Sequence, residues 1–246
     1  MFIILARPNG TFLELPQPAC TLPNMNNSNA THSLCLIEHS ALASAHGPIQ
    51  LGACNRVIYV IEGALQINGE TLTADHATFS PAAMTISVSD QGARWLRWEL
   101  LTNHEPERFE HDDDITSTLK TLDAITTAQV QADWFMRCDS VSFPPGGCAL
   151  THTHKGPGIR YLLDGTIRID TLGESTGYDV GGAWYESGPH PVFAQADAAL
   201  DTRFVRAMVL PPELAGKSSI TYVNADDLDK PKSQSYHRYC EQPLIL

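Results

Sequence analysis

The sequence predicts an all-β protein built from two copies of one strand-rich unit in tandem. Glycine (17 residues) and proline (16 residues) interrupt the chain often. The segments between them are short and rich in Val, Ile, Tyr, Phe and Thr, which favours strands over helices. One strand-turn-strand pattern occurs in each half, and 246 residues accommodate two units of ordinary domain size.

Strands are expected in both halves of the chain. The residues that favour them are concentrated in short segments: 57–61, 64–67, 85–88, 94–101, 141–143, 159–163, 166–170 and 204–210. Long amphipathic stretches are scarce, so we expect helices to contribute little to the core.

The repeated unit is a strand, a glycine turn and a second strand. It reads VIYVIEGALQI at 57–67 and IRYLLDGTIRI at 159–169. Each copy has a tyrosine (Tyr59 or Tyr161) four residues before the glycine (Gly63 or Gly165), and an acidic residue directly before that glycine. An internal repeat of this kind indicates two copies of one structural unit.

An acidic run at 110–114 (EHDDD) marks the boundary between the two halves, because like charges repel and are best solvated. Apolar residues then follow at helical spacing, behind the candidate N-cap Asp114: Ile115, Leu119, Leu122 and Ile125. Residues 115–130 are therefore either a helix or an extended linker with apolar anchors. We expect an N-terminal unit at 1–110, a linker at 111–130, and a C-terminal unit with a tail at 131–246.

Charge excludes several kinds of partner. The chain has 28 acidic and 16 basic residues and a formal net charge of −12, so it has no basic surplus for nucleic acid or an anionic membrane. The first residues lack an apolar run long enough for a signal peptide or a membrane span, and we expect a cytoplasmic protein. The six cysteines form no CxxC pair, so no zinc ribbon or redox motif is indicated.

Three histidines stand out as candidate metal ligands. His152 and His154 lie two residues apart, and in a strand such residues point to the same face. His190, in the segment SGPHP, is a candidate third ligand from another strand. Three imidazoles leave coordination positions open for water, substrate or dioxygen.

The frame around the first two histidines resembles the first motif of the cupin superfamily. That motif is a glycine, five residues, HxH, three or four residues, a glutamate, six residues and a glycine. Gly146, His152, His154 and Gly165 match it, whereas Gly158 stands in place of the usual glutamate.

The segment GAWYESGPH, residues 182–190, resembles the second cupin motif, which ends in a metal-binding histidine. It is one residue shorter than usual between its glycine and His190. The resemblance implies two tandem cupin barrels of the jelly-roll type (double-stranded β-helices). It also implies that His152, His154 and His190 bind a divalent metal ion inside the C-terminal barrel.

The missing glutamate directs attention to two other residues. Glu186, four residues before His190, is the nearest replacement carboxylate, either as a fourth ligand or as an acid/base group beside the metal; the alternative is an exposed residue at a strand end. If position 158 faces the metal, period two also turns Arg160 inward. Arg160 would then pair with a substrate carboxylate or phosphate, with Glu186, or in a structural ion pair at the barrel rim.

The N-terminal barrel lacks these ligands. When Gly63 is aligned with Gly165, Gln50 and Gly52 take the positions of His152 and His154, and Arg56 takes that of Gly158. We expect this barrel to have lost its metal and to serve in structural support and dimerisation.

The function that these features favour is a metal-dependent enzyme acting on a small, possibly anionic molecule in the C-terminal barrel, with Glu186 and Arg160 as candidate catalytic residues. Dioxygenase-like chemistry is preferred, because an open ligand face leaves room for substrate and dioxygen. The alternatives are a non-catalytic module that senses a small ligand or metal, and a cupin isomerase or lyase. The metal is iron, manganese, nickel, zinc or copper, and a homodimer is expected.

Overall fold

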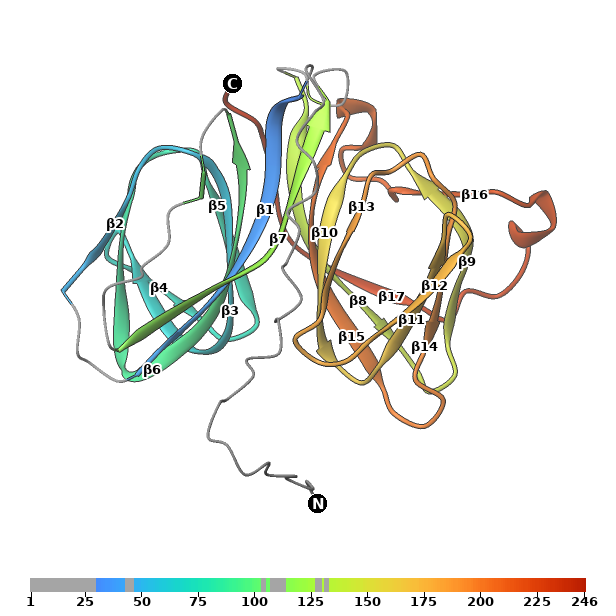
Figure 1. Cartoon of the computed structure of the whole chain (residues 1–246), viewed down its shortest axis with the longest axis horizontal. Coiled ribbons are helices and arrows are strands. Elements are labelled where there is room, and N and C mark those ends of the chain that lie inside the picture. The colour runs from blue at the N-terminus through green and yellow to red at the C-terminus, as the bar shows by residue number, and fades with distance from the viewer. Residues whose placement is uncertain (1–29, 43–46, 103–104, 107–113, 127–129, 131–132) are drawn as a thin grey trace, which may run out of the picture.

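The computed structural model describes residues 30–42, 47–102, 105–106, 114–126, 130 and 133–246 (Figure 1). Within these residues the only helices are two short 3₁₀ helices, η2 (Pro212–Leu214) and η3 (Ala225–Asp227). No helix in this part of the chain is long and apolar enough to cross a membrane. Antiparallel strands make up the rest of the regular structure, as the glycine and proline punctuation predicts.

One sheet forms the N-terminal half, at the blue-to-green end of the chain in Figure 1. Its strands are β1 (Ala30–Ala41), β2 (Ile49–Leu51), β3 (Asn55–Ile67), β4 (Glu70–Thr73), β5 (His76–Ser80), β6 (Met84–Leu101) and β7 (Ile115–Thr126). The main path runs β4-β3-β6-β1-β7, with β2 paired to β6 and β5 paired to β3. The long strands β3 and β6 contribute most of the core of this half, in which Ile58, Leu65 and Trp95 are buried.

Two five-stranded sheets form the C-terminal half. Their strands are β8 (Phe135–Phe143), β9 (Cys148–His154), β10 (Gly158–Asp164), β11 (Ile167–Thr171), β12 (Glu174–Tyr178), β13 (Ala183–Glu186), β14 (Val192–Ala196), β15 (Thr202–Leu210), β16 (Ile220–Tyr222) and β17 (Ser235–Pro243). One sheet has the order β13-β10-β15-β8-β17 and the other β12-β11-β14-β9-β16. Their facing sides enclose a second core around Phe143, Trp184 and Phe204.

The repeated glycine has the same role in both halves. Gly63 and Gly165 each have φ of +73°, a left-handed conformation that favours glycine. A Cβ on Gly63 would collide with the carbonyl oxygen of Gly92, and one on Gly165 would lie 2.6 Å from the carbonyl oxygen of Asp201. The glycine therefore allows a close approach of a neighbouring chain segment in each barrel.

Residues 115–126 are a strand, which corrects the helical alternative, and much of the predicted linker is thus part of the first sheet. β7 pairs with β1 from Ala41↔Ile115 onward, with a register shift between Leu36 and Ile37. At this shift β7 has one extra residue, so Leu119 and Leu122 both pack against the small core of Cys35, Ile37 and Leu101. The bulge gives a strand the three-residue spacing that is typical of a helix.

The two halves share a third core. It is built from outward-facing residues of β1, β3 and β6 on one side and of β8, β10 and β15 on the other, including Tyr59, Trp98, Ile159 and Tyr161. The indole Nε1 of Trp98 donates a hydrogen bond of 3.2 Å to the carbonyl oxygen of Ile159. The two barrels are therefore packed back to back rather than joined only by a tether.

Candidate metal and substrate site

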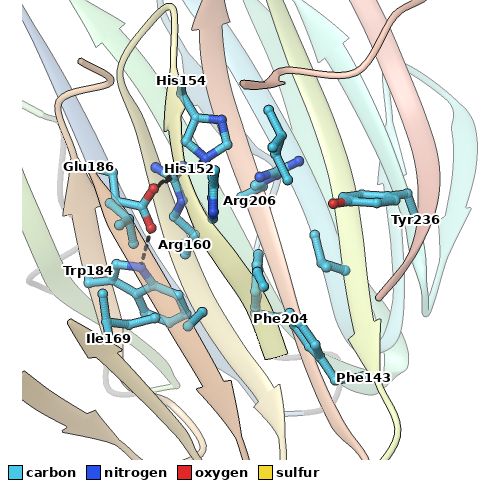
Figure 2. Close-up of a pocket in the computed structure, with 15 residues that line it drawn as sticks. Phe143, His152, His154, Arg160, Ile169, Trp184, Glu186, Phe204, Arg206 and Tyr236 are labelled. Atoms are coloured by element: carbon cyan, nitrogen blue, oxygen red, sulfur yellow. Dashed lines mark hydrogen bonds and ion pairs between the residues drawn. The ribbon is translucent and has the colours of Figure 1, made fainter. Parts of the chain in front are cut away.

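A small cavity lies between the two sheets of the C-terminal half and contains the predicted histidine pair (Figure 2). Its free space of about 20 Å³ accommodates roughly one water molecule. Apolar side chains form most of the wall, and the polar groups converge at one end. The lining residues are Val141, Phe143, Ala149, His152, His154, Arg160, Ile169, Trp184, Glu186, Val192, Ala194, Phe204, Arg206, Ile220 and Tyr236.

Alternation along β9 directs His152 and His154 inward, as the sequence predicts, and both are at least 95% buried. The Nδ1 of His152 lies 2.8 Å from the carbonyl oxygen of Leu150, and that of His154 lies 3.1 Å from the carbonyl oxygen of Ser219. A carbonyl only accepts, so each Nδ1 carries the proton and each Nε2 keeps its lone pair. This is the arrangement that orients a metal-binding histidine.

Burial keeps both imidazoles neutral. Loss of solvent lowers the pKa of His154 from its ordinary value to about 4 and lowers that of His152 in the same direction. The nearby Arg160 guanidinium further disfavours protonation of both rings. Neutral imidazoles with free Nε2 lone pairs are the form that binds a metal ion.

Glu186, at the end of β13, lies beside His154. Its Oε1 accepts a hydrogen bond of 2.9 Å from Nε1 of Trp184, and its Oε2 lies 2.7 Å from the NH2 nitrogen of Arg160. Burial alone would raise the pKa of Glu186, but Arg160 and then His154 lower it below the usual range. Glu186 is therefore a buried carboxylate, not the exposed residue that the alternative expectation described.

Cross-strand pairing explains why the carboxylate comes from β13. Gly158 is the direct partner of Glu186 across the β10–β13 ladder. A Cβ on Gly158 would lie 2.6 Å from Cγ of Met208 and 2.8 Å from the carbonyl oxygen of Ala207, so no larger side chain fits there without a shift. The acid that the motif usually has at position 158 is thus replaced by its neighbour on the adjacent strand.

Two arginines bring positive charge to the same end of the cavity. Arg160 is 1% exposed, and its NH1 also donates to the carbonyl oxygen of Gly158 at 2.6 Å. Burial lowers its pKa to about 10, so it stays charged near neutrality. Arg206, on the neighbouring β15, donates from Nε to Oδ1 of Asp139 at 2.6 Å. Two cations and two carboxylates therefore balance inside this barrel.

The polar end fits a divalent cation in its donor types. The Nε2 of His154 and the Oε2 of Glu186 are both acceptors, and they lie 3.4 Å apart. Oε2 contacts Arg160 in a geometry that is not a hydrogen bond, and among the described residues it has no hydrogen-bond partner. Oε2 already has the Arg160 guanidinium as its counter-cation, and imidazole and carboxylate are ligand types that a divalent metal ion also accepts.

The structure does not bring His190 to this site, although the sequence predicts it as the third ligand. His190 is exposed, in the segment between β13 and β14, and does not line the cavity. The short connection explains this: β13 ends at Glu186, and the carbonyl of Gly188 already accepts a hydrogen bond of 2.8 Å from the backbone N–H of His154. Within the described residues, no three His, Cys, Asp or Glu side chains are close enough together to hold a metal as they stand.

The N-terminal barrel has different chemistry at the corresponding position. Gln50 and Gly52 are exposed, whereas Arg56 is 2% exposed and contacts Oε1 of Glu99 through Nε and NH2, both at 2.7 Å. Arg97 donates to the same carboxylate at 3.0 Å. A buried ion cluster thus lies where the aligned glycine of the other barrel lies.

Sequence reasoning missed Arg206, Asp139 and Tyr236. Arg206 lies in the run FVRAMVL, and Asp139 lies in FMRCDSV. A charged residue in an apolar strand is almost never fully buried without a partner. The charged residues in these two apolar segments therefore indicated a buried ion pair.

Comparisons with known proteins support the fold. No family model matches the chain, and no curated protein matches it. Among solved structures, AerE from Microcystis aeruginosa has a TM-score of 0.53 and 13% identity, covering 72% of this chain and 88% of its own. Salicylate 1,2-dioxygenase from Pseudaminobacter salicylatoxidans has a TM-score of 0.50 and 11% identity, covering 77% and 74%. A variant of that enzyme in complex with gentisate has a TM-score of 0.50 and 12% identity, covering 77% and 72%.

These neighbours are cupin-fold proteins. At such low identity the likeness shows the fold alone, and it confirms the predicted all-β architecture of cupin jelly-roll barrels.

Proposed function

We propose that the C-terminal barrel binds a divalent metal ion through His152, His154 and Glu186 and acts on a small anionic molecule as a dioxygenase-like oxidoreductase. The observation that carries this proposal is the pair of buried side-chain atoms, Nε2 of His154 and Oε2 of Glu186, which lie 3.4 Å apart in the cavity. His152 presents a third neutral donor to the same cavity.

This donor set differs from the one that the resemblance implied, and the difference favours oxygen chemistry. Two histidines and one carboxylate with open positions are typical of non-haem iron(II) oxygenases. Iron is therefore preferred over manganese, nickel, zinc or copper. When bound, such a metal supplies coordination positions at which dioxygen and substrate meet.

The chain's own residues prepare the site. Arg160 holds Glu186 in its charged form, and Trp184 fixes the other carboxylate oxygen. Once Glu186 serves as a ligand, the Arg160 guanidinium is available for a carboxylate or phosphate of the substrate, which its planar fork matches. Phe143, Ile169 and Phe204 contribute to the apolar wall of the cavity.

One observation favours the alternative, a non-catalytic module that binds a metal or a very small ligand. The cavity's free space of about 20 Å³ is far below the roughly 300 Å³ of ordinary substrate pockets. A catalytic role therefore requires that the cavity widen when substrate enters.

The test is oxygen consumption by protein loaded anaerobically with iron(II), measured against a panel of small aromatic and aliphatic carboxylates. Oxygen uptake with at least one class of carboxylate is expected in the wild type and in His190→Ala. No uptake is expected in His152→Ala/His154→Ala. Metal binding by wild type without uptake for any class supports the binding module instead. Equal uptake by the double variant contradicts the proposal.

A further inference from the structure

A second, larger cleft adjoins the inner cavity of the same barrel. It has a free volume of about 280 Å³ and lies between β8, β15, β17 and the loop that follows η2. Arg206 and Tyr236 line both this cleft and the inner cavity, so they form the boundary that the two share. In Figure 2, Tyr236 points toward Arg206, whose guanidinium lies 5.9 Å from the ring centre.

The cleft is basic although the chain as a whole carries −12. Its base contains Arg137 and Arg206, at most 3% exposed, whose charges are matched by Glu241 and Asp139. At its rim are Lys217 and Arg238, both exposed. Arg238 lies 3.6 Å from a carboxylate oxygen that Arg137 already contacts at 2.6 Å.

The rim therefore has a surplus of positive charge. No ion pair to Lys217 is found in the part of the chain that the structure describes. Counting Arg137, Arg206, Lys217 and Arg238, which line the cleft, against Asp139 and Glu241 leaves an excess of two positive charges. Glu213, which pairs with Lys155 at 3.2 Å, also lies close enough to interact with the charge of Lys217. A surface with such an excess attracts small anions, and low-dielectric walls strengthen the attraction.

The loop of the cleft is connected to the metal ligands by hydrogen bonds. The carbonyl oxygen of Ser219, a cleft residue, accepts from Nδ1 of His154 at 3.1 Å. Two residues earlier, the carbonyl oxygen of Lys217 accepts from NH1 of Arg137 at 2.9 Å. A ligand that contacts Lys217 thus contacts the segment that orients His154.

We propose that this cleft binds the anionic group, a carboxylate or a phosphate, of the small molecule on which the inner cavity acts. Its place next to Arg206 and Tyr236 lets one molecule reach from the basic rim toward His152 and His154. The part of this proposal that places the rest of the molecule beside His152 and His154 depends on the proposed function. Anion binding in the cleft does not depend on it, because anion binding requires no metal.

The test uses the metal-free full chain at low ionic strength, where exposed charges are least screened. Inorganic phosphate and succinate are titrated separately by calorimetry, which distinguishes phosphate from carboxylate recognition. The variant is Lys217→Ala/Arg238→Ala. The matched control, Lys155→Ala/Arg168→Ala, removes the same charge from exposed positions outside the cleft.

At least one probe is expected to bind the wild type and the control with similar affinity. We expect about tenfold or weaker binding in the cleft variant, equivalent to about 1.4 kcal/mol. In the wild type, the probe should also shift the ring resonances of His154 in NMR spectra. Binding that is absent from the wild type, or that weakens equally in both charge variants, overturns the proposal. If the wild type binds the anion but binds no divalent metal ion, only the proposed function is contradicted.

Discussion

Gly158 and Glu186 are direct cross-strand partners on β10 and β13. Their pairing explains how a barrel without the usual glutamate still presents a carboxylate to its histidines. The crowding around Gly158 also predicts that a glycine is required at this position for full stability. Gly158→Ala should lower the free energy of unfolding by about 1–3 kcal/mol, because its Cβ meets Cγ of Met208 at 2.6 Å. Urea denaturation measures this change.

The control for that substitution is Gly177→Ala on β12, where an added Cβ meets nothing within 4 Å. It should change stability by no more than about 0.5 kcal/mol. Equal effects at the two glycines would show that crowding at Gly158 has no special role.

The buried pair of Arg160 and Glu186 predicts a link between stability and metal. Arg160→Gln leaves the carboxylate without its cation, and breaking a buried pair in this way destabilises a protein by about 3–5 kcal/mol. A divalent metal should restore most of that loss, and it should raise the melting temperature of the variant more than that of the wild type. Thermal unfolding with and without manganese(II) measures both effects.

Arg168→Gln is the matched control, because Arg168 is 51% exposed and pairs with Asp170 on the surface of the same barrel. Its stability and metal response should equal those of the wild type. If manganese stabilises Arg160→Gln no more than it stabilises this control, Glu186 is not a ligand.

His39 predicts how stability depends on pH. Arg97 donates from Nε to Nε2 of His39 at 3.2 Å, and Nδ1 lies 2.8 Å from Oγ of Ser117, so the buried ring is neutral. Burial, and then Arg97, lower its pKa well below 6.5. At this site the unfolded chain binds a proton that the folded chain does not bind. His39 alone therefore lowers stability as pH drops below about 6.5, by up to about 1.4 kcal/mol per pH unit.

That slope should become smaller in His39→Gln and stay unchanged in His76→Gln, which alters an exposed histidine. Urea denaturation at several pH values between 5 and 7.5 gives the slopes. An unchanged slope in His39→Gln would falsify the assignment of the acid sensitivity to this residue.

Asn55 attaches the C-terminal segment to the first barrel. Its side chain donates to the carbonyl oxygen of Ile245 at 2.7 Å and accepts from the backbone N–H of Ile245 at 2.9 Å. Asn55→Ala should destabilise the chain by about 1–3 kcal/mol in scanning calorimetry. Gln66→Ala, which removes an exposed hydrogen bond to Thr71, should have little effect. Similar losses in both variants would contradict a structural role for this attachment.

The fold was largely predictable because its signals are local. The strand segments, the repeated glycines and the inward pair His152 and His154 all follow from residue type and period two. β7 was not predictable as a strand, because its bulge places Leu119 and Leu122 on the same small core at a helical spacing. The bulge arises from pairing with β1, which is distant in sequence.

The site was predictable only in part, for a similar reason. Glu186 and Arg160 were found by their distance from the motif, but the choice between Glu186 and His190 depends on where β13 ends. The role of Gly158 depends on Met208 and Ala207 of another strand. Arg206 and Asp139 become recognisable as a buried pair only when β15 and β8 are placed side by side.

The most direct test of the account is the metal content of four proteins incubated with the same excess of iron(II) or manganese(II) and then desalted under anaerobic conditions. We expect one bound metal ion per chain in the wild type and in His190→Ala, and strongly reduced metal content in Glu186→Gln and in His152→Ala/His154→Ala. Full occupancy in Glu186→Gln, together with loss in His190→Ala, would contradict it and restore the three-histidine set.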